Sequence, residues 1–313
     1  MPQETLERLD IRPGGSYLDA TLGSGGHSAE ILRRAGDGAR LLGIDRDPEA
    51  LQRAGARLAP LPGHKVLVRG NHADLGRIAD ENGFSELDGV LIDTGVSSDQ
   101  LDTASRGFSF QADGPLDMRM DPDHGESAAQ LLARLDVNAM ADLFRRLGEE
   151  PRAMHVARSI DRARAFAPIT TTGQLADIVS KALGGPGRFH GRHPATRVFQ
   201  ALRMAVNGEL EALEAAIEAA IVRLRPGGRL VVITFESLSD RLVKRRFAAH
   251  AGRDVSLQQG GSRWEGDLPR MCLLDRHAVA PSKAEVAANP RSRSAKLRAL
   301  RAPLPGEFSA EST

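Results

Sequence analysis

The chain has 313 residues, of which 41% are hydrophobic and 27% are charged, a balance typical of globular proteins. Its formal net charge of +1 excludes an overall field that draws it to nucleic acid or membrane, so any basic surface must be local. The single cysteine, Cys272, excludes an intrachain disulfide framework. Because there is no signal peptide and no apolar run of roughly 20 residues, we expect a cytoplasmic protein that does not enter membranes.

Short apolar runs alternate with helical patterns in the first third of the chain, which is typical of a parallel α/β sheet. Strands are expected over residues 16–20, 41–44, 65–68 and 88–93. The helix after the second strand is expected to end near Leu58, and the next helix to cover residues 73–82. From residue 103 to residue 194 the alternation stops, and the pattern predicts loops and helices.

A single long amphipathic helix is predicted next, because apolar residues from Val198 to Leu224 recur at helical spacing. It is expected to end at Pro226-Gly227-Gly228, before a strand over residues 229–235. The predicted organisation is a doubly wound α/β core of residues 1–102 and 195–302, a helical insertion of residues 103–194 and a flexible tail of residues 303–313.

A glycine-rich turn after the first strand indicates a nucleotide-like ligand. Gly23, Gly25 and Gly26 let the backbone approach a ligand closely, and the helix that His27 opens directs free N–H groups toward it. Asp45 ends the second strand, where a carboxylate can accept hydrogen bonds from the ribose of any adenosine cofactor. The turn lacks the spaced G-x-G-x-x-G of dinucleotide-binding proteins, and by itself it leaves a nicotinamide cofactor and S-adenosylmethionine both open.

The segment before the fifth strand favours S-adenosylmethionine. A helix that ends at Pro226-Gly227-Gly228 and leads into an apolar strand resembles the corresponding segment of class I S-adenosylmethionine methyltransferases. Each piece alone is explained equally well as a turn or a helix stop. Together and in this order, the pieces favour a methyltransferase.

Longer motifs narrow the resemblance to one family. They are GGH at 25–27, DTGVSSDQLD at 93–102, RGFSF at 106–110, DGPLDMRMDP at 113–122, RHPATR at 192–197 and NPRSRS at 289–294. From about Ile11 to Arg298 the chain closely resembles the bacterial ribosomal RNA small-subunit methyltransferase H family. The resemblance implies a class I, Rossmann-like α/β fold with a mostly helical inserted domain for substrate recognition. It also implies methyl transfer from S-adenosylmethionine to the exocyclic N4 of a cytidine in the decoding region of 16S rRNA, within the small ribosomal subunit.

The resemblance also assigns the cofactor site. Matched position by position, it implies that the cofactor is bound by Gly25, Gly26, His27, Asp45, His72, Asp93 and Gln100. At the position of His72 the family often carries an aromatic residue, and an imidazole can stack on adenine or meet its edge in the same place.

The chain departs from the family pattern in several places. It begins after the family's opening segment, His-x-Pro-Val-Leu-Leu-x-Glu. Thr94 and Asp99 stand where the family has leucine and proline, and Glu236 stands where it has histidine. A carboxylate at Glu236 would repel phosphate where an imidazole would contact RNA, so these departures concern the substrate side more than the cofactor side.

Catalysis on a cytosine amino group should depend mainly on positioning, because its lone pair is delocalised into the ring and an acceptor must take the N4 proton. Asp93 and the turn that contains Ser97 are expected to supply that acceptor. The base must be unpaired or leave its stack, and Phe108 and Phe110 are candidates to stack on it. The alternative for these two rings is a local core anchor.

Two basic motifs are expected to bind RNA. One contains Arg192, His193 and Arg197, although His193 can equally cap a helix. The other begins at NPRSRS and should meet phosphate; it comprises Arg291, Arg293, Lys296, Arg298 and Arg301. Lys244-Arg245-Arg246 is more simply a solvated face. We expect the acidic residues between 113 and 123 to form a structured loop rather than a metal site, and the sequence predicts no protein partner.

Two other functions stay open on the residues alone. A catalytically weakened relative that acts as a small-subunit assembly factor would fit the departures at Thr94, Asp99 and Glu236. A nicotinamide oxidoreductase would fit the glycine turn taken alone. The methyltransferase hypothesis accounts for the long motifs as well.

Overall fold

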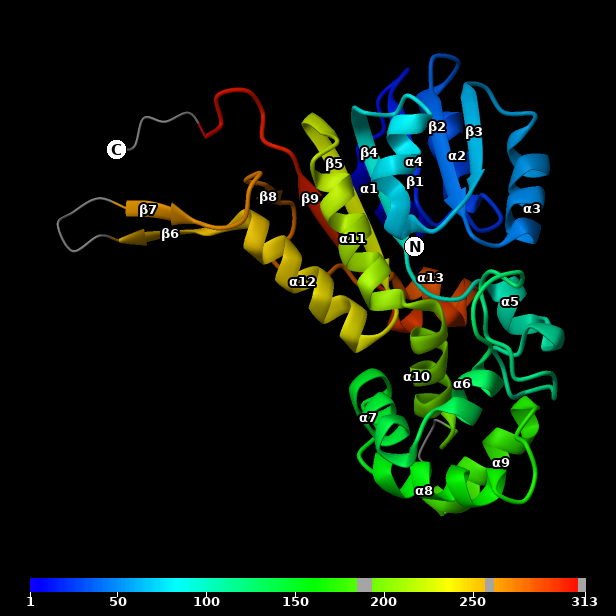
Figure 1. Ribbon diagram of the computed structural model, residues 1–313. Coiled ribbons are helices and arrows are strands. Elements are labelled where there is room, and N and C mark those ends of the chain that lie inside the picture. The colour runs from blue at the N-terminus through cyan, green and yellow to red at the C-terminus, as the bar shows by residue number, and fades with distance from the viewer. Residues whose placement is uncertain (185–192, 257–261, 309–313) are drawn as a thin grey trace. The chain divides into compact units, whose positions relative to one another are not determined.

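A computed structural model describes residues 1–184, 193–256 and 262–308 of the chain (Figure 1). The chain divides into two units. The sheet unit comprises Met1–Gly95 and Leu210–Thr313, and the helical unit comprises Val96–Glu209. The helical unit therefore covers more of the sequence, at both ends, than the predicted insertion of residues 103–194.

The sheet unit is built on seven strands in the order β3-β2-β1-β4-β5-β9-β8 (Figure 1). The five parallel strands are β1 (Ser16–Asp19), β2 (Arg40–Asp45), β3 (His64–Arg69), β4 (Leu87–Asp93) and β5 (Leu224–Thr234). They correspond to the five predicted strands, which confirms the class I, Rossmann-like α/β fold. At the edge, β9 (Lys296–Arg301) pairs antiparallel with β5, and β8 (Cys272–Leu273) pairs with β9.

Alternation along the strands produces two cores, one on each face of the sheet. Leu41 and Leu91 face one core, while their neighbours Leu42 and Ile92 face the other. The first core is closed by α1 (Pro2–Leu9), α2 (Gly26–Ala35) and α3 (Pro48–Leu58). The second is closed by α4 (Leu75–Glu81), α11 (Glu209–Ile221) and α12 (Ser237–Ala251). The inner parallel strands β1, β2, β4 and β5 are thus buried on both faces, as in doubly wound folds, whereas β3 at the edge of the sheet is half-buried.

The predicted single helix from Val198 to Leu224 is wrong. The chain forms α10 (Thr196–Asn207) and then α11, and the break lies at Gly208, whose φ of 57° is a left-handed conformation that ends a helix. The hydrophobic pattern did not reveal the break because both helices keep the same apolar periodicity.

The predicted helix end at Pro226-Gly227-Gly228 is also wrong, because these residues lie inside β5. The ladder between β4 and β5 shifts register between Leu87 and Gly89, opposite this segment. A proline that cannot donate to the ladder is tolerated at such an irregularity.

The remaining segments of the sheet unit were not predicted as regular structure. They include the antiparallel strands β8 and β9, the hairpin of β6 (Arg253–Ser256) and β7 (Ser262–Glu265), and α13 (Lys283–Ala288). Residues 309–313 of the predicted flexible tail lie outside the described residues. The part before them is tied to the sheet unit, since Glu307 accepts two hydrogen bonds from the guanidinium of Arg301.

The helical unit contains α5 (Ser98–Asp102), α6 (Ala128–Arg134), α7 (Val137–Gly148), α8 (Ala153–Arg164), α9 (Thr172–Leu183) and α10. Its core includes Phe144, Ile160, Val179 and Leu202, all fully buried. Within the described part of this unit no strand forms, as the sequence predicts, apart from an isolated bridge between Pro115 and Thr171. Nowhere in the described ranges is a helix long and apolar enough to cross a membrane.

Candidate functional site

Three aspartates lie at the carboxyl ends of parallel strands in the sheet unit: Asp19 on β1, Asp45 on β2 and Asp93 on β4. The chain runs outward from β1 to β3 on one side and from β4 to β5 on the other. The order therefore reverses between β1 and β4, and ligands of open α/β sheets bind in the crevice at this reversal.

The glycine turn joins this edge to α2. Gly23 has a φ of 52° and Gly25 a φ of 77°, conformations that side chains rarely adopt. A Cβ added to Gly25 would lie 3.3 Å from the Cβ of Ala54, so this glycine also allows α2 to pack closely on α3. Gly25 is the N-cap of α2 and offers no side-chain cap, which leaves the first N–H groups of the helix available to a ligand.

Asp45 holds the glycine turn in place. Its carboxylate accepts the Gly23 N–H at 2.7 Å with Oδ2 and the Asp47 N–H at 2.9 Å with Oδ1. Burial raises the pKa of Asp45 above its ordinary value, although these backbone hydrogen bonds oppose the shift. Each carboxylate oxygen has a further lone pair, so Asp45 can still accept hydrogen bonds from ribose hydroxyls.

His27 and Asp93 face each other across the reversal, with 3.6 Å between His27 Nε2 and Asp93 Oδ2. Burial lowers the pKa of His27, but the carboxylates of Asp93 and Asp19 outweigh it, and the pKa is raised overall. Among the described residues, nothing forms a hydrogen bond with the buried atoms His27 Nδ1 and Asp93 Oδ1. Buried polar atoms are normally paired, so both indicate a polar ligand at this point.

Asp19 is a candidate site residue that the sequence interpretation missed. Its side chain is 1% exposed, accepts a hydrogen bond from the Ser28 hydroxyl at 2.7 Å, and accepts another from the Thr21 N–H at 3.2 Å. Burial raises its pKa to about 6. The signal was present, because a carboxylate that ends the strand before a glycine turn must lie at the carboxyl edge.

His72 lies beyond β3 and begins a short 3₁₀ turn, η1 (His72–Asp74). Burial, together with the positive charge of Arg46, lowers its pKa to about 4. Arg46 is held on the adjoining Asn71 side chain, at 2.5 Å. The imidazole is therefore neutral at physiological pH.

These residues fit S-adenosylmethionine. Glycines at positive φ and an uncapped helix end suit its methionine carboxylate, Asp45 suits its ribose, and the neutral His72 suits its base. The carboxylates of Asp19 and Asp93 suit its positive charges. All of the predicted cofactor residues except Gln100 belong to the carboxyl edge of the sheet unit.

Comparison with known proteins agrees with this chemistry. The model of the MraW methylase family matches residues 1–302. The chain belongs to this family. Membership confirms the predicted resemblance and the prediction of an S-adenosylmethionine-dependent methyltransferase, and it removes the nicotinamide oxidoreductase alternative.

Relatives named ribosomal RNA small subunit methyltransferase H are similar over nearly their whole length. The relative from Nitratidesulfovibrio vulgaris is 50% identical over 299 residues, 95% of this chain and 92% of its own. The relative from Symbiobacterium thermophilum is 49% identical, over 95% of this chain and 94% of its own. The relative from Pelobacter propionicus is also 49% identical, over 96% of each chain. An rRNA methylase structure from Streptococcus thermophilus, at 11% identity and a TM-score of 0.40, covers 96% of this chain and 93% of its own but is too distant to support an argument.

Ser97 and Gln100 belong to the helical unit and form the capping box of α5. The Gln100 N–H donates to Ser97 Oγ at 3.1 Å, and the Ser97 N–H donates to Gln100 Oε1 at 3.1 Å. This accounts for both residue types at their spacing by helix initiation. Their predicted catalytic and cofactor roles remain predictions.

The two phenylalanines that were candidates for base stacking pack inside the helical unit. Phe108 is 7% exposed and belongs to the core. The ring of Phe110 packs on His193 at 4.5 Å and on Phe199 at 4.8 Å between centroids. Since Phe108 is not accessible, the structure favours the core-anchor alternative for this pair. His193 Nδ1 also accepts the Ala195 N–H at 3.2 Å, just before α10, but α10 has no side-chain cap, so the capping alternative for His193 is not supported.

The basic residues expected at RNA fall into two groups. Arg192 lies outside the described residues. Arg197, Arg291 and Arg293 are exposed, with Arg197 Nη1 3.8 Å from Glu150 Oε2. Further along the second motif, Lys296 and Arg298 both bind the carboxylate of Asp240, so these two cations hold β9 against α12.

The acidic loop is structured by an ion pair, whereas in the 244–246 run Lys244 and Arg245 are exposed and Arg246 is partly buried. Asp117 binds Arg119 through both oxygens, at 2.7 and 2.8 Å. Arg246 binds Glu218 and Asp267, at 2.7 and 3.1 Å.

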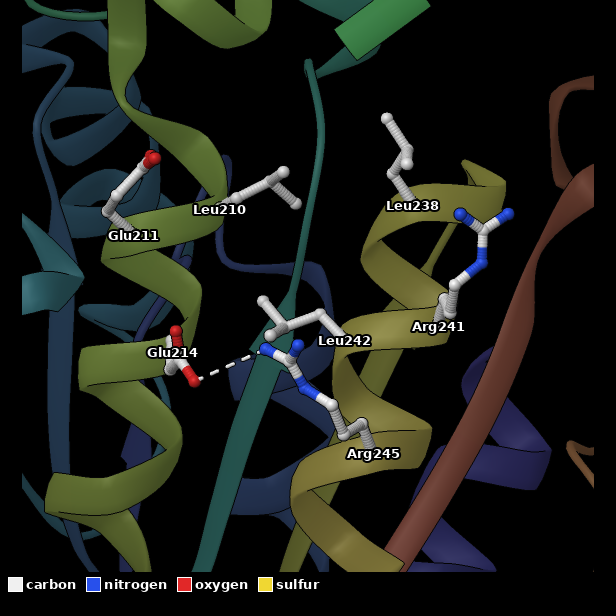
Figure 2. A pocket seen from close by; sticks show the side chains of 7 residues that line it. All are labelled: Leu210, Glu211, Glu214, Leu238, Arg241, Leu242 and Arg245. Atoms are coloured by element: carbon white, nitrogen blue, oxygen red, sulfur yellow. Dashed lines mark ion pairs between the residues drawn. The ribbon is translucent and has the colours of Figure 1, made fainter. Parts of the chain in front are cut away.

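A groove of about 340 Å³ lies between α11 and α12 of the sheet unit (Figure 2). Its apolar lining is Leu210, Leu238 and Leu242, and Arg245 Nη2 lies 3.6 Å from Glu214 Oε1 across it. None of the predicted site residues lines this groove, so we do not assign it to the candidate site.

Proposed function

We propose that this protein transfers a methyl group from S-adenosylmethionine to the exocyclic N4 of a cytidine in the decoding region of 16S rRNA. The observation that supports this most directly is the pair of buried, unsatisfied atoms, His27 Nδ1 and Asp93 Oδ1, at the strand reversal. The names of the relatives agree, since each is a small-subunit rRNA methyltransferase. The proposed substrate is the small ribosomal subunit, and the cytoplasm, where ribosomes are assembled, is the proposed location.

The cofactor supplies an electrophilic methyl group, and the chain's own residues supply positioning. In our proposal Asp93 Oδ1 accepts the N4–H of the cytosine, which turns the amino lone pair toward the methyl group and takes up the proton it loses. This needs no strong base, because an oriented acceptor within hydrogen-bond reach is sufficient. The predicted positioning role of Ser97 stays a prediction.

The helical unit is proposed to recognise the substrate. The target base must be unpaired or leave its stack to reach a carboxylate at a sheet edge. The proposed phosphate contacts are Arg197 of the helical unit and, on the sheet unit, Arg291 and Arg293, since all three are exposed cations. Phe108 is not part of the proposal, because its ring is buried.

The test is mass spectrometry of decoding-region RNA from small subunits that lack the modification, after incubation with the protein and S-adenosylmethionine. N4-methylcytidine should appear, and Asp93→Asn should lower the rate by about 10²- to 10⁴-fold. Asp80→Asn, which changes an exposed carboxylate on α4 that binds Arg223, is the matched control. Subunit binding without any methylcytidine would contradict the proposal and favour an assembly factor.

A further inference from the structure

The outer face of α8 carries three exposed basic side chains and an exposed aromatic ring. His155, Arg158 and Arg162 are all exposed, and they follow one another at intervals of three and four residues, which places them on one side of the helix. Phe166 follows in the next turn, where its N–H donates to the Ala163 carbonyl at 3.1 Å. We refer to these four residues as the α8 face.

Phe166 contributes little to the core of the helical unit. It is 93% exposed, more than any other large hydrophobic residue in the described ranges. The residues around it, Ala165, Ala167 and Pro168, are exposed as well, and the chain is buried again only at Ile169. A phenyl ring accessible in this way is free to stack on a flat partner.

The arginines of the α8 face carry uncompensated charge. Neither Arg158 nor Arg162 has a carboxylate within ion-pair distance among the described residues, and Arg162 donates only to the Ser159 hydroxyl, at 3.1 Å. Neighbouring helices do not neutralise them, since Asp142 on α7 binds Arg145 and Arg146. On α9, Asp177 and Lys181 carry opposite charges.

Other arginines of the same unit differ in this respect. Arg134 binds Glu126 through two hydrogen bonds at 3.0 and 2.9 Å, and Arg164 binds Asp161 at 2.7 Å. Charge on this unit is thus paired in many places, and the α8 face combines two unpaired guanidinium groups with the most exposed ring.

We propose that the α8 face binds an unpaired segment of ribosomal RNA, with Arg158 and Arg162 on phosphates and Phe166 stacked on a base. The proposal rests on the proposed function, which makes rRNA the substrate. The two arginines are four residues apart, about 6 Å along the helix axis, and the ring follows them in line. Cations bind the phosphates of a single-stranded nucleic acid, and an exposed aromatic ring beside them can stack on its bases. An acidic protein segment would use the arginines but has no need of the ring.

The test measures binding of the full chain to a labelled single-stranded fragment of decoding-region RNA and to small subunits, across a range of salt concentrations. Phe166→Ala should raise Kd by about 5-fold or more, and Phe166→Trp should restore binding. Arg158→Gln and Arg162→Gln should each reduce the slope of log K against log salt by about 0.7. Arg134→Gln, an exposed arginine already neutralised by Glu126, is the matched control and should change neither quantity.

The outcomes separate this inference from the proposed function. If the α8-face variants bind RNA as Arg134→Gln does, the inference is wrong, whatever the wild-type protein methylates. If binding to intact subunits falls but binding to the RNA fragment does not, the face contacts a protein and the inference is again wrong. Binding losses in a chain that never forms methylcytidine would support the RNA contact and contradict only the proposed function.

Discussion

Asp19 should make the folded protein less stable at neutral pH than a neutral side chain would. Its pKa is about 6 in the folded state against an ordinary 3.8, because it is buried at the end of β1. Between these two pH values the Asp19 carboxyl is ionised in the unfolded chain but still protonated in the folded chain. The free energy of unfolding therefore falls as pH rises from about 4 to 6 and stays lower above pH 6. The difference between the two pKa values corresponds to about 3 kcal/mol.

Replacing Asp19 with asparagine should therefore stabilise the fold by up to about 3 kcal/mol at pH 7.5 and have little effect below about pH 4. The Ser28 hydroxyl, which now donates to Asp19, can rotate to accept from the amide instead. The assay is urea unfolding of wild type and variant at a series of pH values, with S-adenosylhomocysteine binding measured by calorimetry at pH 7.5.

We expect greater stability together with weaker cofactor binding, since the site loses a carboxylate that suits a cationic ligand. Asp80→Asn is the control, for which we expect a change in stability of the opposite sign. The Arg223 side chain lowers the pKa of Asp80, so removal of that carboxylate should destabilise the fold at neutral pH. A stability difference for Asp19→Asn that does not grow between pH 4 and 6 would refute the reasoning.

Three further predictions concern single side chains. Asn207→Ala should cost about 1–3 kcal/mol in thermal unfolding, because the buried amide donates to the Met118 carbonyl and accepts from the Met120 N–H; an unchanged Tm would contradict this. His72→Phe should gain stability over wild type as pH falls from 6.5 to 4, since its pKa is lowered to about 4 in the folded state; parallel pH–stability curves would argue against it. Glu236→His should raise kcat/KM for small subunits with S-adenosylhomocysteine affinity unchanged, because a carboxylate at the N-terminus of α12 repels phosphate; equal kcat/KM values would exclude this role.

The five parallel strands could be predicted because each is a short apolar run that is visible in the local sequence. The break at Gly208 could not, since the apolar periodicity of α10 and α11 is nearly continuous and only the backbone conformation of one glycine separates them. The strand β9 was hidden for another reason. Its basic residues suggested a surface for phosphate, whereas Lys296 and Arg298 bind the nearly buried Asp240.

Residue type and spacing were ambiguous wherever a side chain could serve the fold or the ligand. Ser97 and Gln100 satisfy a capping box, and Phe108 lies in the core of the helical unit. One sequence alone does not distinguish these roles. A helix cap and a ligand contact use the same polar atoms, and a ring in the core uses the same apolar surface as a ring that stacks on a base.

The sequence by itself determined the class of this protein: a parallel α/β sheet, a glycine turn with Asp45 beyond it, and motifs long enough to identify the family. These are local properties, set by the order of residues along the chain. Only the tertiary structure decided the electrostatics of the site. Burial raises the pKa of Asp19. The meeting of β1, α2 and β4 brings His27 Nε2 to 3.6 Å from Asp93 Oδ2 and leaves a buried atom of His27 and of Asp93 without a hydrogen bond among the described residues. Desolvation and charge coupling depend on what surrounds a group in space, and residues far apart in the sequence supply those surroundings.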